Sequence, residues 1–154
     1  FSAVEKGALE GLEAGALSGN PVRDIEITLL DGSYHEVDSS EIAFNMAASI
    51  AVHNALAKAS PVLLEPIIRL EVVTPANYLG DVLGDFNMRR GRVLNLELRG
   101  ERYFIHGFVP LAEMFGYATA IRSLTQGRAN YSMEPYAYEP VPQQLTEKIL
   151  GIAK

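Results

Sequence analysis

The chain has 154 residues, of which 48% are hydrophobic and 21% are charged, enough for one ordinary domain or two small ones. This composition excludes a disordered tail, a collagen-like chain and a coiled coil, and the absence of cysteine excludes disulfides and cysteine-ligated metals. The net charge of −6 disfavours non-specific binding to nucleic acid, because neutralising phosphates requires cations.

The charge is unevenly distributed along the chain. Residues 1–66 contain three basic and ten acidic side chains, residues 67–141 contain eight of each, and residues 142–154 have a net charge of +1. The longest uncharged segment, residues 42–57, is too short and too polar to span a bilayer. We therefore expect a soluble, cytoplasmic protein without a membrane partner.

The first predicted helix has apolar residues at helical spacing and a row of glycines four residues apart. The apolar residues are Phe1, Val4, Ala8 and Leu12, and the glycines are Gly7, Gly11, Gly15 and Gly19. The small-residue face is expected to lie close on a sheet, and Gly19-Asn20-Pro21 to end the helix. Residues 22–30 alternate between apolar and polar, which predicts a half-buried strand.

A second, longer helix is predicted after the turn Asp31-Gly32-Ser33. Asp38-Ser-Ser-Glu41 is typical of a capping box with Asp38 as the cap, and the helix extends to about residue 59, before Pro61. Residues 62–64 predict a short strand. The first 66 residues thus follow a helix-strand-helix-strand order.

An internal repeat of about 36 residues organises the second half. Strands are predicted at residues 67–73 and 93–98, and again at 103–109 and 129–138. A helix lies between the strands of each copy, and the second has the apolar residues Leu111, Met114, Phe115, Ala118 and Ile121. Two βαβ copies predict a ferredoxin-like sheet with both helices on one face, each closed by a glycine in a left-handed turn, Gly91 and Gly127. A C-terminal docking helix follows Pro142.

The sequence lacks the common catalytic signatures. It has no phosphate-binding loop, no dinucleotide fingerprint, no His-Glu-x-x-His and no Gly-x-Ser-x-Gly. His53 and His106 fall inside a helix and a strand, where packing or a partly buried partner is expected. His35 lies at a predicted loop tip, where contact with a partner is favoured over catalysis.

Two sets of long motifs are the most specific features of the sequence. The first set contains Asp31-Gly-Ser-Tyr-His-Glu-Val-Asp-Ser-Ser-Glu41, followed by Ala43-Phe44, and Pro61-Val-Leu-Leu-Glu-Pro-Ile67. The second contains Val73-Thr-Pro75, Gly80-Asp-Val-Leu-Gly-Asp85, Arg89-Arg-Gly91, Val109-Pro-Leu-Ala-Glu-Met-Phe-Gly-Tyr-Ala-Thr119, and Arg122-Ser with Thr125-Gln-Gly-Arg128. The first set resembles the fourth domain, and the second the fifth domain, of the elongation factor G family of bacterial translational GTPases. The resemblance implies part of domain IV at 1–66, domain V at 67–141 and a docking helix at 142–154. It also implies a left-handed βαβ crossover in the first unit.

The resemblance further implies a C-terminal fragment of a factor that moves tRNA and mRNA on the ribosome. GTP and magnesium would bind an absent N-terminal domain, so this fragment is expected to have no enzyme activity and no cofactor. The partners implied are rRNA, the tRNA anticodon region and ribosomal proteins, with the chain monomeric. Its decoding-region contact would be Gly32, Ser33, Tyr34, His35 and Glu36. A weaker rRNA contact would be Arg89, Arg90 and Arg92. They belong, with Arg99 and Arg102, to a cluster of five arginines within 14 positions, whose alternative role is as solvated ends of a helix and two strands.

Three other classes of function stay open. A βαββαβ module could bind a small ligand, or could recognise RNA through spaced aromatics on its third strand, although residues 103–109 lack the Lys/Arg-Gly-Phe/Tyr motif. A paralogue could instead serve ribosome recycling or protection against tetracycline.

Overall fold

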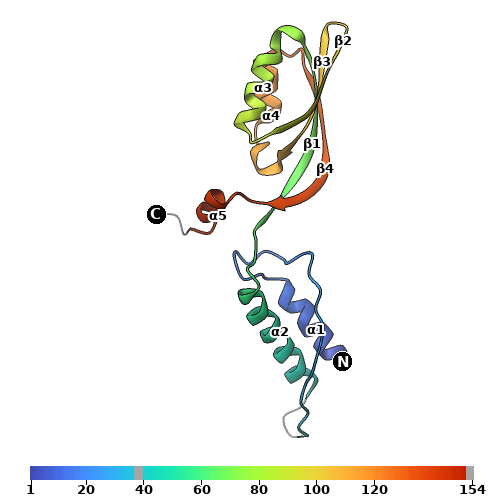
Figure 1. The fold of residues 1–154 in the computed structure, drawn as a ribbon, viewed down its shortest axis with the longest axis vertical. Helices are drawn as coiled ribbons and strands as arrows, with labels where there is room; N and C mark the ends of the chain where they lie inside the picture. Colours follow the sequence, from blue (N-terminus) through green and yellow to red (C-terminus); the bar gives the residue numbers. More distant parts are fainter. Residues whose placement is uncertain (37–39, 152–154) are drawn as a thin grey trace. The chain divides into compact units, whose positions relative to one another are not determined.

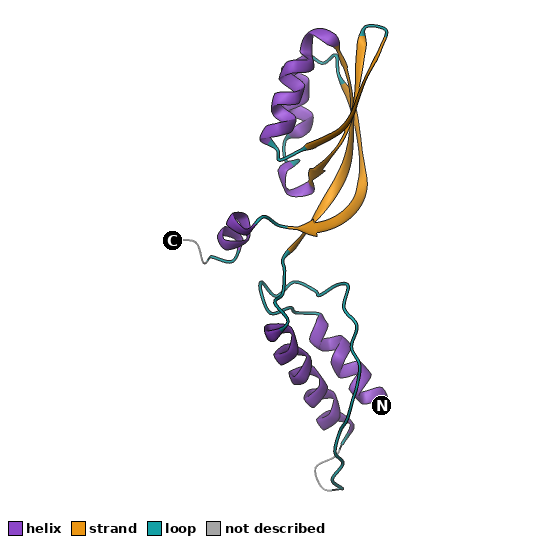
Figure 2. Cartoon of the chain, in the orientation of Figure 1, coloured by secondary structure: helices purple, strands orange, loops and turns teal. Residues whose placement is uncertain are grey.

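The computed structural model describes residues 1–36 and 40–151, which form two compact units. Unit 1 comprises Phe1–Leu63 and Pro142–Lys154, and unit 2 comprises Leu64–Val141. The described residues contain five α-helices and one four-stranded antiparallel sheet, which confirms the α+β class (Figures 1 and 2). No helix among these residues is long and apolar enough to cross a membrane.

Unit 2 has the predicted ferredoxin-like order. Its elements are β1 (Leu64–Pro75), η1 (Ala76–Tyr78), α3 (Leu79–Met88), β2 (Arg92–Arg99), β3 (Arg102–Pro110), η2 (Leu111–Glu113), α4 (Tyr117–Thr125) and β4 (Asn130–Pro140). The strand order is β2-β3-β1-β4, with every neighbouring pair antiparallel. Both helices lie on one face of the sheet (Figure 1).

The core of unit 2 lies between that face and the two helices. Alternate residues of β1 and β3 point into it because successive side chains in a strand face opposite sides of the sheet. Its most buried members are Leu70, Val72, Val82, Phe86, Ile105 and Val109. The four strands predicted from the repeat are therefore confirmed in this unit.

Two glycines allow the Phe86 ring to lie directly against the backbone. A Cβ atom at Gly91 would overlap this ring, and one at Gly107 would lie 2.7 Å from its Cζ atom. In the first copy the left-handed residue is Arg90, with a φ of 56°, rather than the predicted Gly91. Gly91 is thus needed for space, whereas Gly127, with a φ of 76°, makes the predicted left-handed turn.

The second predicted helix of the repeat is shorter than expected. Gly116 has a φ of 73°, so the chain leaves the helical region there and α4 begins only at Tyr117. Met114 and Ile121 are buried as predicted, but Phe115 is 96% exposed. The apolar residues keep their helical spacing from Leu111 to Ile121, across the position where Gly116 interrupts the helix.

Unit 1 is built on two packed helices, α1 (Ser2–Leu12) and α2 (Glu41–Lys58). A Cβ atom at Gly7 would overlap the carbonyl oxygen of Asn45, and one at Gly11 would lie 3.1 Å from Val52. The small-residue face therefore lies on a helix, and the prediction that it lies on a sheet was wrong. Because glycine has no side chain, the backbone of α1 can approach the backbone carbonyl groups of α2 closely.

The first helix ends earlier than predicted, at Leu12 instead of near Gly19. The amide of Val22 donates to the carbonyl of Leu12 over 2.8 Å, and the amide of Gly15 donates to the carbonyl of Asn20 over 2.8 Å. These bonds close a loop that takes the place of the last predicted turns.

The second helix has the predicted length but a different cap. Ser40 is the N-cap, and its hydroxyl accepts from the amide of Ala43 over 3.1 Å. The predicted cap, Asp38, lies outside the described residues. The predicted tail helix is present as α5 (Gln143–Ile149), preceded by Pro142.

The two strands predicted in unit 1 are not strands. Residues 22–30 form no strand: no described segment pairs with them, and Asp24 has a φ of 56°. Residues 62–63 are likewise unpaired, whereas Leu64 begins β1. A strand exists only where a neighbour accepts and donates its backbone hydrogen bonds. The described residues of unit 1 therefore do not form the expected helix-strand-helix-strand order or its left-handed βαβ crossover.

Candidate functional site

The predicted tip loop lies between residues 22–30 and α2. Gly32, Ser33, Tyr34, His35 and Glu36 are all exposed and contiguous. At the start of the loop, the amide of Gly32 donates to Oδ1 of Asp31 over 2.7 Å. The loop thus presents an imidazole, a phenol, a hydroxyl and a carboxylate on a short stretch of chain.

The ring of Tyr34 stacks on the ring of Phe44, in the first turn of α2. Their centroids are 6.3 Å apart and their planes differ by 11°. Phe44 is partly buried, and its amide donates to the carbonyl of Ser40 over 3.0 Å. Sequence reasoning missed Phe44, although an aromatic residue one helical turn inside a cap is a usable signal for a loop contact.

Exposed polar side chains of this kind are suited to binding rather than to covalent chemistry. A catalytic base needs a nucleophile and an orienting group within hydrogen-bond reach. All five tip residues are exposed, so their polar groups are accessible to a partner for hydrogen bonding.

The other two histidines differ from each other in their surroundings. His106 in β3 is partly buried, and its Nδ1 lies 3.1 Å from a carboxylate oxygen of Glu71, so it has the partner expected from the sequence. His53 in α2 is exposed, so the expectation that it packs in the interior was wrong. Its position on the helix faces away from α1, which only the packing of the two helices could reveal.

The predicted arginine set is largely engaged within unit 2. Arg89 donates from Nε to Asp85 over 2.9 Å, and from its terminal nitrogen to the carbonyls of Glu113 over 2.6 Å and Phe115 over 3.2 Å. Its guanidinium also lies 5.0 Å from the ring centroid of Tyr117. Burial raises the pKa of Tyr117, whose hydroxyl has no partner among the described residues. Arg89 therefore ties α3 to the segment that precedes α4.

Arg90 forms a two-pronged ion pair with Glu65, at 2.8 and 2.9 Å, and a further bond to Glu113 at 3.1 Å. Glu65 is only 9% exposed, so its carboxylate needs this cation. Hydrogen bonding to Glu65 raises the pKa of Arg90. This side chain is structural in the isolated unit.

Arg92 is the most accessible member of the predicted set. Its guanidinium is paired with both carboxylate oxygens of Glu139 at 2.9 Å, but its side chain is 62% exposed. An exposed pair of this kind contributes little to stability and can exchange its partner. The guanidinium of Arg92 is therefore more accessible to RNA than those of Arg89 and Arg90.

Three other arginines of unit 2 are exposed and make no ion pair with any described residue: Arg102 in β3, Arg122 in α4 and Arg128 after it. Arg102 donates to the carbonyl of Arg128 over 3.3 Å. Sequence reasoning placed Arg102 in the basic cluster but missed Arg122 and Arg128 as a site. The signal was available, because Arg128 ends the quoted motif that begins at Thr125.

The uncovered face of the sheet has three aromatic rings, each under an arginine. Arg99 lies 4.7 Å from the centroid of Phe104, Arg92 lies 5.8 Å from Phe108, and Arg69 lies 5.5 Å from Tyr136. Spaced aromatics are thus present on the third strand of the repeat, despite the missing motif. Each arginine is also paired with a glutamate: Glu97, Glu139 or Glu134. These three carboxylates balance the three guanidinium charges, so the face as a whole does not favour the RNA-recognition alternative, even though Arg92 alone can exchange its partner.

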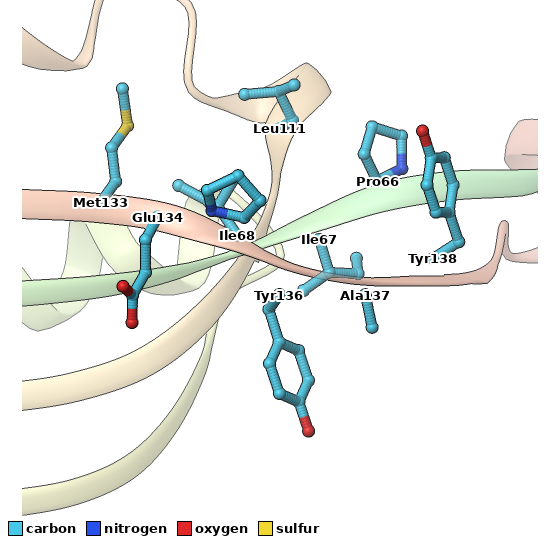
Figure 3. A pocket seen from close by; sticks show the side chains of 10 residues that line it. Pro66, Ile67, Ile68, Leu111, Met133, Glu134, Tyr136, Ala137 and Tyr138 are labelled. Carbon is cyan, nitrogen blue, oxygen red and sulfur yellow. The ribbon is translucent and has the colours of Figure 1, made fainter.

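A hollow of about 490 Å³ lies where β1 and β4 meet η2 (Figure 3). Met133 and Leu111 extend to one side of the strands, and Glu134 and Tyr136 to the other. The lining is apolar apart from Glu134, which is paired with Arg69 at 3.0 Å, and the tyrosine hydroxyls. Specific ligand sites need convergent polar groups, so this hollow does not favour the small-ligand alternative.

Comparison with known proteins assigns both units. The family model described as elongation factor G, domain IV, matches residues 1–60, and that described as elongation factor G C-terminus matches residues 62–149. This chain belongs to the elongation factor G family. The elongation factor G of Aquifex pyrophilus is 55% identical over 148 residues, covering 96% of this chain and 21% of that protein. A crystal structure from Thermus thermophilus matches with a TM-score of 0.88 and 45% identity, covering 97% of this chain and 23% of the other.

The chain thus spans about a fifth of the length of its elongation factor G relative. The tip loop falls in the region that matches domain IV, and the arginines fall in the region that matches the C-terminus. Neither matched region contains the nucleotide site of the family. Among the described residues, no group of three or more His, Cys, Asp or Glu side chains could hold a metal ion.

Proposed function

We propose that this chain supplies the tip and rRNA-contacting domains of a cytoplasmic elongation factor that promotes GTP-dependent translocation of tRNA and mRNA on the ribosome. GTP and magnesium would bind elsewhere in the longer protein. The proposed division is domain IV at 1–66, domain V at 67–141 and a docking helix at 142–154, acting as part of a monomer.

The observation that most supports this proposal is the exposed loop of the acidic unit. Five contiguous exposed residues, Gly32 to Glu36, precede a helix whose cap bond is in place. A unit with a net charge of −7 over residues 1–66 does not bind RNA indiscriminately, so its contact would depend on shape and a few hydrogen bonds. His35 is proposed to reach the tRNA backbone near the anticodon as a donor or a steric stop.

For rRNA, the proposal ranks the arginines by availability. Arg122 and Arg128 have no internal ion pair with described residues, and Arg92 can exchange Glu139 for a phosphate. Arg89 and Arg90 remain in the proposed set, with their internal bonds as a competing use.

The test is His35→Ala in the full-length factor. We expect single-turnover translocation to slow by at least about tenfold, while ribosome-stimulated GTP hydrolysis stays within about twofold, because a loss of contact at the tip leaves the nucleotide site intact. His53→Ala is the matched control, since it removes an exposed imidazole from α2. Translocation at the wild-type rate in His35→Ala would overturn the proposal, and a defect confined to ribosome recycling would favour the paralogue.

A further inference from the structure

We propose that Tyr34 is a positioning residue for His35 and that it acts through its stack on Phe44. The inference rests on the proposed function of the tip loop. It divides the tip residues into one that contacts the partner and one that holds the contact in place.

The ring pair of Tyr34 and Phe44 is a tertiary contact between the tip loop and α2. The centroid separation of 6.3 Å and the angle of 11° lie within the range of offset-stacked aromatic pairs, which is about 4.5–7 Å. Residues 34 and 44 are ten positions apart, so the stack connects the loop to a helix that is already fixed.

The base of the stack is held independently of the loop. Phe44 lies in the first turn of α2, its amide is bonded to the carbonyl of Ser40, and the Ser40 hydroxyl caps the same turn. The backbone of Phe44 is therefore fixed whether or not Tyr34 packs against its ring. Tyr34 is 68% exposed even with the stack in place, so the stack is a contact that can order it.

Fixing the Tyr34 ring restricts the neighbouring histidine. One peptide unit joins the two residues, so anchoring Tyr34 removes backbone conformations from His35 and reduces the entropy lost when the imidazole binds. At the other end of the loop, the Asp31 carboxylate holds the amide of Gly32. The loop is thus held on both sides of Ser33 before any partner arrives.

The competing role for Tyr34 is direct contact with RNA through its hydroxyl. The two roles differ in which atoms matter. Positioning needs the ring of Tyr34 and a ring at Phe44, whereas direct contact needs the hydroxyl and does not involve Phe44.

The experiment compares Tyr34→Phe, Phe44→Tyr and Phe44→Leu in the full-length factor, each with and without His35→Ala. We expect Phe44→Tyr to translocate within about twofold of wild type, because it keeps the stack. Tyr34→Phe removes only the hydroxyl and should stay clearly faster than His35→Ala. Phe44→Leu should slow translocation by about threefold to tenfold, and should add nothing in the His35→Ala background, since no histidine remains to be positioned.

A second readout does not depend on the ribosome. In NMR spectra of the present chain, the amide signals of residues 32–36 should move in Phe44→Leu but not in Phe44→Tyr, while helical circular dichroism stays unchanged. This separates loop disorder from loss of α2.

Wild-type translocation in Phe44→Leu, with His35→Ala still slow, overturns the positioning role and leaves the proposed function standing. A Tyr34→Phe variant that is as slow as His35→Ala also overturns it, in favour of hydroxyl contact. Wild-type translocation in His35→Ala instead overturns the proposed function itself.

Discussion

Regularly alternating apolar residues are buried in unit 2 but partly exposed in unit 1. In unit 2, Ile105 and Val109 of β3 are 0% exposed, because α3 and α4 cover that face of the sheet. In unit 1, Ile25, Ile27 and Leu29 alternate just as regularly but are 42%, 46% and 52% exposed. Alternation therefore determines which side chains share a face, and it says nothing about whether a neighbouring strand or a covering layer exists.

Helix α2 repeats this contrast within one element. Ala48, Val52 and Leu56 are buried in unit 1, whereas Ile42, Met46 and Ile50 form an exposed row with 56–73% exposure. A helix that is apolar on two sides is typical of one packed between two layers. Only one of those layers, α1, is present among the described residues of the unit.

The largest expected effect compares one substitution in both units. Ile105→Ala should lower the free energy of unfolding by about 2–5 kcal/mol, because it removes buried methyl groups and leaves a cavity. Ile27→Ala, at a site that is 46% exposed, should change it by less than about 0.5 kcal/mol. Urea unfolding followed by circular dichroism measures both. Equal losses would mean that residues 22–30 are covered in solution and would remove the contrast.

Glycines provide a second, smaller comparison. Gly7→Ala should lower the stability of unit 1 by about 1–3 kcal/mol, because the new methyl group overlaps the carbonyl of Asn45. Gly84→Ala is the matched control: it lies inside α3 with open space around it and should stabilise unit 2 by up to about 1 kcal/mol. Thermal melts monitored at a helical wavelength report both. An unchanged melt in Gly7→Ala would show that α1 and α2 do not pack closely.

The smallest effects are expected on ribosome affinity, and they distinguish arginines with an internal ion pair from those without one. Arg128→Gln in the full-length factor should weaken ribosome binding only slightly, and should reduce the slope of log affinity against log salt by about 0.7–0.9. Arg90→Gln should reduce that slope by less than Arg128→Gln does, because its internal bonds compete with RNA, and should cost unit 2 about 1–3 kcal/mol, because Glu65 loses its cation. Ribosome-binding titrations at several salt concentrations, with urea unfolding alongside, test both. A reduced slope in Arg90→Gln alone would reverse the ranking of the cations.

The part of the fold that is local in sequence could be predicted. Strand alternation and the paired glycines are properties of neighbouring residues, so the repeat indicated the sheet of unit 2. The break at Gly116 could not be predicted, because a positive φ does not change the spacing of apolar residues, and that spacing continues past Gly116 to Ile121. The strand predicted at residues 22–30 failed because pairing depends on residues elsewhere.

The candidate sites divide in the same way. The tip loop is one contiguous segment, so its residues could be named together from sequence. The partners of Arg89 and Arg90 lie 24 and 25 positions away, at Glu113 and Glu65, and no local pattern announces them. Phe44 is ten residues from Tyr34, and its role depends on a loop folding back onto a helix.

One guanidinium joins the two copies of the repeat. Arg89 belongs to the first copy, and its donors reach the carbonyls of Glu113 and Phe115 in the second. The sheet already interleaves the two copies, because β1 of the first pairs with β3 and β4 of the second, unlike the stacked units of a modular repeat. Separating the copies would also leave these two carbonyls without their donor, so we expect unit 2 to unfold in one cooperative transition.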